Sequence, residues 1–484
     1  MLKPGKIELT DRQFILRLLG GYLVVNLALL GFASLWNLNR AWFSLDYLLV
    51  VLVYVWVSRS LAAGLFGVCL LADFVRMLVP LFFYTSQAFS AQFWLREVLH
   101  WPTRMLVVGG LAAGLLLAAM IWFVRRYRLM RTNRRAATMV ALTLAVTLVL
   151  LDWINGTSSR AIGDANLFSA NLASSPAYLI AAATRETISG TPATFTPLPL
   201  EASATGRYVL GQLPAGNTNG GDMKTLLAQA QLPGKILLIV AESLSVRADD
   251  PDMLRWRRPF AAVTNRYTIE AGKLDWSGST LRGEFRELCW TAKDGIHIGE
   301  VPDSLPKILA GMGYETVFVH GFFSGMYDRK IIHPRLGFAR LIFLEEFQQQ
   351  MDQPLAGTLF SGARDSYTAE VVRQTFHQPG RQFIEWLTLS AHVPIDVGYA
   401  KELATPTERA AQGEQPASVW GHTVICTRLM EHIAQIAADP AFGEGDIIIV
   451  GDHPVPLQDA RSQRYYEPGK IPFLILRHRT MAEN

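Results

Sequence analysis

The C-terminal half of the chain opens with an apolar run that ends in a carboxylate, Lys235-Ile-Leu-Leu-Ile-Val-Ala-Glu242. Three more short, mainly apolar runs follow it, at 316–319, 383–389 and 447–450. Runs of this kind are typical of strands that are buried on both faces. Residues 303–312 and 419–438 have the pattern of helices. The alternation predicts an α/β fold with a mainly parallel sheet covered by helices on both faces.

The residues that directly follow these runs are of the kinds that bind metals and phosphate. The first run ends at Glu242, and the others are followed by His320-Gly321, Ser390-Ala-His392 and Gly451-Asp452-His453. The carboxyl ends of parallel strands meet at one edge of a sheet, where ligands of such folds bind. One histidine after a strand is more often structural, but four such groups at one edge favour a metal site.

A candidate nucleophile lies in the segment Trp276-Ser-Gly-Ser-Thr-Leu-Arg-Gly-Glu-Phe-Arg-Glu-Leu288. A glycine-containing turn leads into a predicted helix, 281–290, with Ser279 or Thr280 at its N-cap. A hydroxyl there lies beside unpaired backbone N–H groups and the positive end of the helix dipole, which favour an alkoxide and a bound phosphate. Such a hydroxyl is commonly an ordinary cap, but its place between Glu242 and the Asp-His pair in the chain favours a nucleophile.

Nearly all long apolar stretches fall in the first 153 residues, whereas nine of the ten histidines fall from His297 onward. The apolar part predicts an α-helical membrane domain, because about 20 apolar residues cross a bilayer as a helix. Asp73 and Arg76 are expected to pair on one face of its third helix. The five predicted transmembrane helices cover residues 18–36, 42–57, 61–84, 105–124 and 136–153.

Basic residues precede the first of these helices, and six arginines lie from Arg125 to Arg135. The positive-inside rule places both segments in the cytoplasm. Five spans then put the rest of the chain outside the plasma membrane, in the periplasm of a Gram-negative cell. The predicted organisation is a membrane domain at 1–153, a linker at 154–234 that can lie at the bilayer interface, and an outer catalytic domain at 235–484.

The composition excludes several other classes of protein. Half of the residues are hydrophobic and 18% are charged, which argues against a disordered chain. The 45 basic and 41 acidic side chains nearly balance, so the charge does not indicate a nucleic-acid partner. The three cysteines lack the spacing of a zinc site, and any metal must therefore be bound by oxygen and nitrogen.

The motifs together resemble those of lipoteichoic acid synthases, within the alkaline phosphatase and sulfatase superfamily that also contains the phosphoethanolamine transferases. The resemblance covers residues 235–478, and five preceding spans suit both branches. It rests on Glu242, Gly278-Ser-Thr-Leu-Arg-Gly-Glu-Phe285, His320-Gly321, Met326-Tyr-Asp-Arg329, Leu336-Gly-Phe338, Leu387-Thr-Leu-Ser-Ala-His392 and Gly451-Asp-His453, in this order.

The resemblance implies a role for each matching residue. Thr280 corresponds to the nucleophile, which is also a ligand of one divalent metal, Zn²⁺ or Mn²⁺. The other metal ligands correspond to Glu242, Asp452 and His453. The groups that hold the phosphate of the substrate correspond to Arg329 and His392, with Tyr327 as an aromatic contact and His320 in a less defined role. A metal-bound hydroxyl loses its proton easily, and His392 is able to protonate a leaving alkoxide.

The implied function is the transfer of a phosphorus-containing headgroup from a phospholipid donor to an envelope glycan or lipid acceptor, through a phosphothreonine. A phosphodiesterase or phosphatase of the same fold and a non-catalytic polysaccharide assembly factor remain as alternatives. The headgroup, phosphoethanolamine or phosphoglycerol, stays open.

The sequence departs in three ways from patterns found in other branches of the superfamily, and these departures narrow the reaction and the number of metals that we expect. The Cys/Ser-x-Pro-x-Arg motif of sulfatases is not found near Thr280, which disfavours sulfate ester hydrolysis. A second metal would need further Asp or His ligands, for which only Asp396 is a candidate. Phosphoethanolamine transferases that act on lipid A carry several disulfides, whereas the outer domain here has only Cys289 and Cys426, whose pairing stays open.

Overall fold

The computed structural model describes residues 7–8, 10–35, 40–78, 103–128, 131–154, 173–177, 194–214, 221–276, 278–294, 300–347, 362–457 and 460–479. These residues form two compact units, one up to residue 177 and one from residue 194 onward. The second unit thus begins before residue 235, where the sequence places the start of the outer domain.

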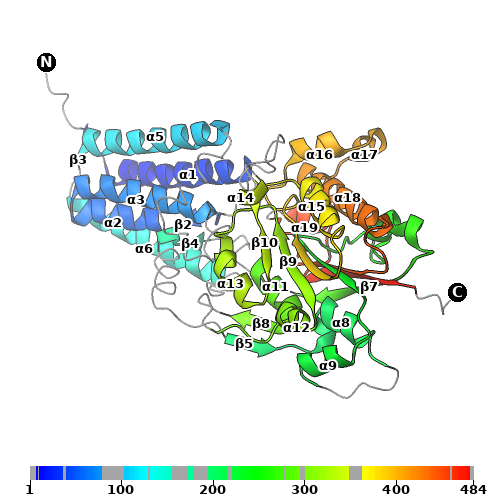
Figure 1. Ribbon diagram of the computed structural model, residues 1–484. Coiled ribbons are helices and arrows are strands. Elements are labelled where there is room, and N and C mark those ends of the chain that lie inside the picture. Colours follow the sequence, from blue (N-terminus) through cyan, green and yellow to red (C-terminus); the bar gives the residue numbers. More distant parts are fainter. Residues whose placement is uncertain are drawn as a thin grey trace. The chain divides into compact units, whose positions relative to one another are not determined.

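The first unit is helical, and a helix forms in each of the five predicted membrane segments. The helices are α1 (Asp11–Leu35), α2 (Asp46–Trp56), α3 (Arg59–Leu78), α5 (Thr103–Arg126) and α6 (Arg131–Ile154). Two stretches, Arg12–Ala33 and Arg134–Leu151, are long and apolar enough to cross a membrane, and the apolar helices Asp46–Trp56 and Leu106–Trp122 are shorter. The unit is therefore an N-terminal helical region (Figure 1), with two candidate spans among the residues that the structure describes. Residues 79–84 of the predicted third span lie outside the described residues.

Asp73 of α3 pairs with an arginine that lies outside its own helix. Its carboxylate accepts two hydrogen bonds from the guanidinium of Arg40, at 3.0 and 2.7 Å, and both side chains are buried. Arg40 also donates to Oδ1 of Asn26 on α1. Arg40 therefore links α1 to α3 through a buried carboxylate. The side chain of Arg76 lies outside the described part of the chain, and the expected Asp73–Arg76 pair stays a prediction.

Part of the predicted linker is ordered. Strand β4 (Ala173–Ser174) pairs with β2 (Phe43–Ser44) in the helical unit. Strand β5 (Thr194–Pro197) pairs with β8 (Thr291–Asp294) in the second unit. Residues 155–172, 178–193 and 215–220 of the predicted linker lie outside the described residues.

The second unit is built on a seven-stranded sheet in the order β10-β9-β11-β6-β12-β13-β7. The five strands from β10 to β12 are parallel, while β13 and β7 join antiparallel at one edge. This confirms the predicted mainly parallel sheet. The strands are β6 (Lys235–Ala241), β7 (Tyr267–Asp275), β9 (Tyr314–His320), β10 (Arg340–Ile342), β11 (Arg381–Leu387), β12 (Asp446–Gly451) and β13 (Lys470–His478).

Helices cover both faces of this sheet (Figure 1). On one face, α15 and α18 bury a core that includes Ile239, Trp386 and Ile449. On the other face lie α8, α11 and α12. Each fully buried Leu or Ile of the central strands contributes about 1.5–3 kcal/mol, which fixes the strand ends rigidly. The covering helices include α8 (Ala204–Leu210), α9 (Met223–Gln229), α11 (Thr280–Cys289), α12 (Leu305–Gly311), α13 (Arg329–Arg335), α15 (Asp365–Thr375), α16 (Val397–Leu403), α17 (Pro406–Ala410) and α18 (Ala417–Ala438).

Candidate metal centre and nucleophile

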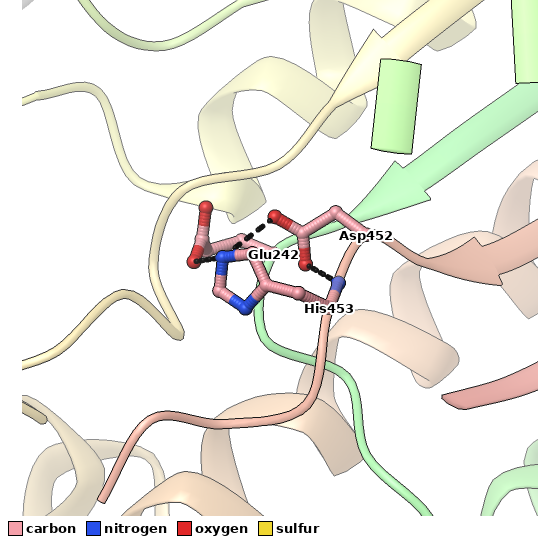
Figure 2. A group of neighbouring side chains, drawn as sticks. All are labelled: Glu242, Asp452 and His453. Atoms are coloured by element: carbon pink, nitrogen blue, oxygen red, sulfur yellow. Dashed lines mark hydrogen bonds and ion pairs between the residues drawn. The ribbon is translucent and has the colours of Figure 1, made fainter. Parts of the chain in front are cut away.

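The ends of the neighbouring strands β6 and β12 bring three metal-type ligands together. Ligand atoms of Glu242, Asp452 and His453 all lie within 4.8 Å of one another, and all three residues are buried. Figure 2 shows Nε2 of His453 facing both carboxylates, at 3.2 Å from Oδ2 of Asp452 and 3.7 Å from Oε1 of Glu242. Nδ1 of His453 lies 3.0 Å from the carbonyl of Pro454 and can only donate to it, so Nε2 is the nitrogen that can bind a metal.

Thr280 joins this group from the helix that follows the nucleophile motif. It is the first residue of α11, and Ser279 is the N-cap. Its hydroxyl Oγ1 lies 3.4 Å from Oε2 of Glu242 and 3.4 Å from Nε2 of His453. The backbone N–H groups of the first helical turn and the dipole therefore lie beside the hydroxyl, as a nucleophilic oxygen needs.

The chemistry of the three ligands fits a divalent cation. Oδ2 of Asp452 is buried and has no hydrogen-bond partner among the described residues. Burial raises the pKa of Glu242, while burial and the charge of Glu242 raise the pKa of Asp452 to about 6. A cation at their common point would supply the missing counter-charge. Carboxylate oxygens, an imidazole nitrogen and a hydroxyl are ligands suited to Zn²⁺ or Mn²⁺.

Two residues of α11 keep the helix against the Asp-His strand end. At Gly283, a Cβ atom would lie only 2.8 Å from the carbonyl oxygen of Asp452 and 3.0 Å from its Cα. The buried Arg286 donates to the carbonyls of Gly451, at 2.8 Å, and Asp452, at 3.3 Å. The close approach of helix and strand explains why the Thr-Leu-Arg-Gly motif needs its glycine.

Gly283→Ala is expected to displace α11 from Asp452, because the backbone that the new methyl group meets cannot rotate away. Overpacking of this kind costs about 1–3 kcal/mol of unfolding free energy and should weaken metal binding as well. Thermal unfolding and metal titration of the purified variant measure the two effects.

The matched control is Gly311→Ala in α12, where a Cβ atom meets nothing within 4 Å. That substitution should leave metal affinity unchanged and leave stability equal or higher. Equal behaviour of the two variants would contradict the close-approach explanation.

Arg329, the predicted phosphate ligand, is held by a carboxylate of the protein. Its Nε and Nη2 donate to Glu284 at 2.7–3.2 Å, and Nε2 of His333 lies 3.1 Å from the same carboxylate. Burial alone would raise the pKa of Glu284, but Arg329 and His333 outweigh burial and lower that pKa to about 2. The ring of Tyr327 lies 4.9 Å from the guanidinium carbon of Arg329. Glu284 therefore fixes the orientation of Arg329, whose contact with phosphate stays a prediction.

The two predicted substrate histidines follow β9 and β11. Nδ1 of His320 donates to the carbonyl of Leu387 at 3.0 Å, and Nδ1 of His392 donates to that of Val393 at 2.6 Å. Burial, with Arg329 near His320 and His453 near His392, lowers the pKa of His320 to about 3 and that of His392 to about 4. In their neutral forms both rings therefore present Nε2 as a proton acceptor, and His392 has to gain a proton before it protonates a leaving alkoxide.

The charges that shift each pKa indicate which of the predicted residues lie near one another at the strand ends. The charge of Arg329 lowers the pKa values of Glu242 and His320. The charge of His453 lowers the pKa of His392, and that of Asp452 raises it. Asp396 instead caps α16, where Oδ1 accepts from the backbone N–H of Tyr399. Cys289 and Cys426 are buried free thiols.

Several supporting residues were not identified from the sequence. The hydroxyl of Thr388 accepts from the backbone N–H of Glu242 at 2.8 Å. The carboxylate of Asp365 accepts from the N–H groups of Leu389 and Ser390 at 2.8 and 3.1 Å. For Thr388, the only signal in the sequence was its place among the hydroxyl residues before His392. For Asp365, the surrounding segment carried no motif that would have marked it.

Comparison with known proteins agrees with this architecture. Residues 263–441 match the family model described as Sulfatase. Over these residues the α/β unit is similar to the sulfatase and alkaline phosphatase superfamily, which agrees with the resemblance of the motifs. No curated protein matches the chain in a sequence search.

The chain is similar in fold to the integral membrane lipooligosaccharide phosphoethanolamine transferase A of Neisseria meningitidis. The two share 14% identity with a TM-score of 0.51, over 99% of this chain and 90% of that one. The lipoteichoic acid synthase LtaP of Listeria monocytogenes matches half of this chain at 15% identity and a TM-score of 0.39, and this chain covers 64% of its length. The C-terminal periplasmic domain of EptC from Escherichia coli matches 55% of this chain at 12% identity and a TM-score of 0.37, with 77% of that domain covered.

Proposed function

We propose that the protein is a membrane-bound, metal-dependent phosphotransferase that moves a phosphoethanolamine or phosphoglycerol headgroup from a phospholipid to an envelope glycan or lipid. The observation that carries the proposal is the approach of the Thr280 hydroxyl to 3.4 Å from Glu242 and from His453. A hydroxyl at a helix N-terminus among metal ligands is placed for nucleophilic attack on phosphorus. The fold that the chain shares with a phosphoethanolamine transferase supports the same reaction class.

The residues present match the needs of one Zn²⁺ or Mn²⁺ ion, held by Glu242, Thr280, Asp452 and His453. When bound, such an ion lowers the pKa of the coordinated hydroxyl and offsets negative charge on the transferring phosphoryl group. We propose a single ion. The cap bond of Asp396, the candidate ligand for a second ion, to the backbone of α16 supports this.

In the first half-reaction, Oγ1 of Thr280 attacks the phosphorus of the donor phosphodiester. The Thr280 O–P bond forms, the bond from phosphorus to the diacylglycerol oxygen breaks, and the hydroxyl proton ends on diacylglycerol. In the second, a hydroxyl of the acceptor attacks the phosphothreonine and regenerates Thr280. We assign the proton transfers to His392, because its neutral ring presents an accepting Nε2 and its pKa responds to His453.

Arg329 and His320 have complementary roles in this scheme. Arg329 offers donors to phosphate oxygens from an orientation that Glu284 and the Tyr327 ring maintain. Neutral His320 presents a lone pair on Nε2, which accepts from a hydroxyl or ammonium group of the headgroup. The donor headgroups with such groups include both phosphoglycerol and phosphoethanolamine.

The test is transfer by the purified full chain in detergent, with phosphatidylethanolamine and phosphatidylglycerol offered separately. Mass spectrometry of envelope glycans and lipids from cells with and without the protein should show one headgroup added to an acceptor. In the assay with purified protein, diacylglycerol should be released from the lipid that serves as donor. Release of free headgroup without any modified acceptor would support a hydrolase instead, and no turnover of either lipid would support a non-catalytic role.

We also propose that five helices span the plasma membrane, namely α1, α2, α3, α5 and α6. The N-terminus would then lie in the cytoplasm and the α/β unit in the periplasm. The arginines from Arg125 to Arg135 support this orientation. A reporter that is active only outside the cytoplasm should work when fused after Asn484 and fail when fused near Arg131. The opposite pattern would contradict a periplasmic reaction.

A further inference from the structure

Ser243, directly after the metal-type ligand Glu242, has an unusual backbone conformation. Its φ angle is 56°, in the left-handed region, and its side chain is fully buried. A non-glycine residue in that region is strained and persists only where surrounding contacts hold it. Specific contacts must therefore hold Ser243 in this conformation.

Ser243 donates to both carboxylates of the metal centre. Its hydroxyl donates to Oε1 of Glu242 at 2.8 Å, and its backbone N–H donates to Oδ1 of Asp452 at 2.7 Å. The left-handed turn makes both bonds available to one residue. Oδ1 of Asp452 also accepts from the N–H of His453, at 2.7 Å, as Figure 2 shows.

These bonds occupy one oxygen of each carboxylate and leave the other. Oε2 of Glu242 is the oxygen that lies 3.4 Å from the hydroxyl of Thr280. Oδ2 of Asp452 is the buried oxygen without a hydrogen-bond partner among the described residues, and it lies 3.2 Å from Nε2 of His453. Oε2 of Glu242 thus lies toward Thr280 and Oδ2 of Asp452 toward His453, while Oε1 of Glu242 accepts from Ser243 and lies 3.7 Å from Nε2 of His453.

The carbonyl of Ser243 is fixed by residues from two further segments. Nε2 of His422, on α18, donates to it at 3.0 Å, and the hydroxyl of Ser245 donates to it at 2.9 Å. The other nitrogen of His422 accepts from the hydroxyl of Tyr466 at 3.0 Å, which sets the tautomer of the ring. The peptide after Ser243 is therefore locked, and its left-handed conformation is maintained.

We infer that Ser243 is a positioning residue: by holding one oxygen of Glu242 and one of Asp452, it fixes the orientation in which the two carboxylates would meet a metal. The inference deepens the proposed function and rests on its metal centre. It concerns the geometry and affinity of that centre and does not depend on which headgroup is transferred. Outer hydrogen bonds of this kind change metal affinity by about 10–100-fold.

The experiment uses Ser243→Gly in the full chain. Glycine keeps the N–H donor and adopts the left-handed conformation easily, so only the hydroxyl bond to Glu242 is lost. The control is Ser203→Ala, which removes a buried serine hydroxyl that caps α8 by accepting from the N–H of Gly206. For each protein, the Zn²⁺ dissociation constant is measured by competition with a chelator, and the visible spectrum is recorded with Co²⁺ in place of Zn²⁺.

Ser243→Gly should raise the dissociation constant by about 10–100-fold and change the Co²⁺ spectrum, because the carboxylate of Glu242 loses the hydrogen bond that orients it. Ser203→Ala should lower the unfolding temperature and leave both metal measurements unchanged. A dissociation constant within about twofold of wild type with the same Co²⁺ spectrum would overturn the inference, as would a wild-type protein that binds no metal. A wild-type protein that binds Zn²⁺ but transfers no headgroup would refute the proposed function alone.

Discussion

Thr280→Ala is expected to abolish headgroup transfer, with a loss on the order of 10⁴-fold or more, as for removal of other catalytic nucleophiles. The physical reason is that the variant lacks the oxygen that lies 3.4 Å from both Glu242 and His453. Most of the metal should stay bound, since two carboxylates and an imidazole remain. Steady-state transfer from labelled phospholipid and metal analysis measure the two quantities.

Intact-mass measurement tests the same residue by an independent observable. Wild-type protein incubated with donor lipid should gain the mass of one headgroup, and peptide mapping should place it on Thr280. Ser279→Ala is the matched control, because Ser279 is the N-cap but makes no side-chain cap hydrogen bond among the described residues. Ser279→Ala should reduce transfer activity far less than Thr280→Ala does. An adduct on Ser277 or Ser279, or an active Thr280→Ala variant, would assign the nucleophile to another hydroxyl.

Asp452→Ala and His453→Ala are each expected to remove the metal. Wild-type protein should contain about one equivalent of Zn²⁺ or Mn²⁺, and each variant should weaken binding well beyond the 10–100-fold effect of an outer hydrogen bond. Zn²⁺ at about 1,000 times its dissociation constant should stabilise the wild-type protein by about 4 kcal/mol. That stabilisation should be lost in both variants, as thermal unfolding with and without Zn²⁺ would show.

The control for this pair is His377→Ala, since His377 is half exposed and pairs with Asp439 away from the ligand group. Its metal content should equal that of the wild type. Two tightly held equivalents in the wild-type protein, or full metal content in His453→Ala, would contradict the single-metal centre.

The sequence determined the sheet and the ends of its strands. Each of the four apolar runs became a strand within a few residues of its predicted limits, because a buried parallel strand needs a local run of apolar residues. The side chains after those runs were predicted to meet, and Glu242, Asp452 and His453 do. Parallel pairing of β6 with β12 is sufficient to place their following residues at one edge.

Only the tertiary structure decided the partners of buried charges and hydroxyls. Arg329 pairs with Glu284, 45 residues away, and Asp73 pairs with Arg40, 33 residues away. The bond from Ser243 to Asp452 joins residues 209 apart. Such contacts depend on which helix packs on which strand, and a local sequence pattern carries no information about that choice. The ligands are thus encoded locally, whereas the hydrogen bonds that orient them arise only when the whole sheet and its covering helices are assembled.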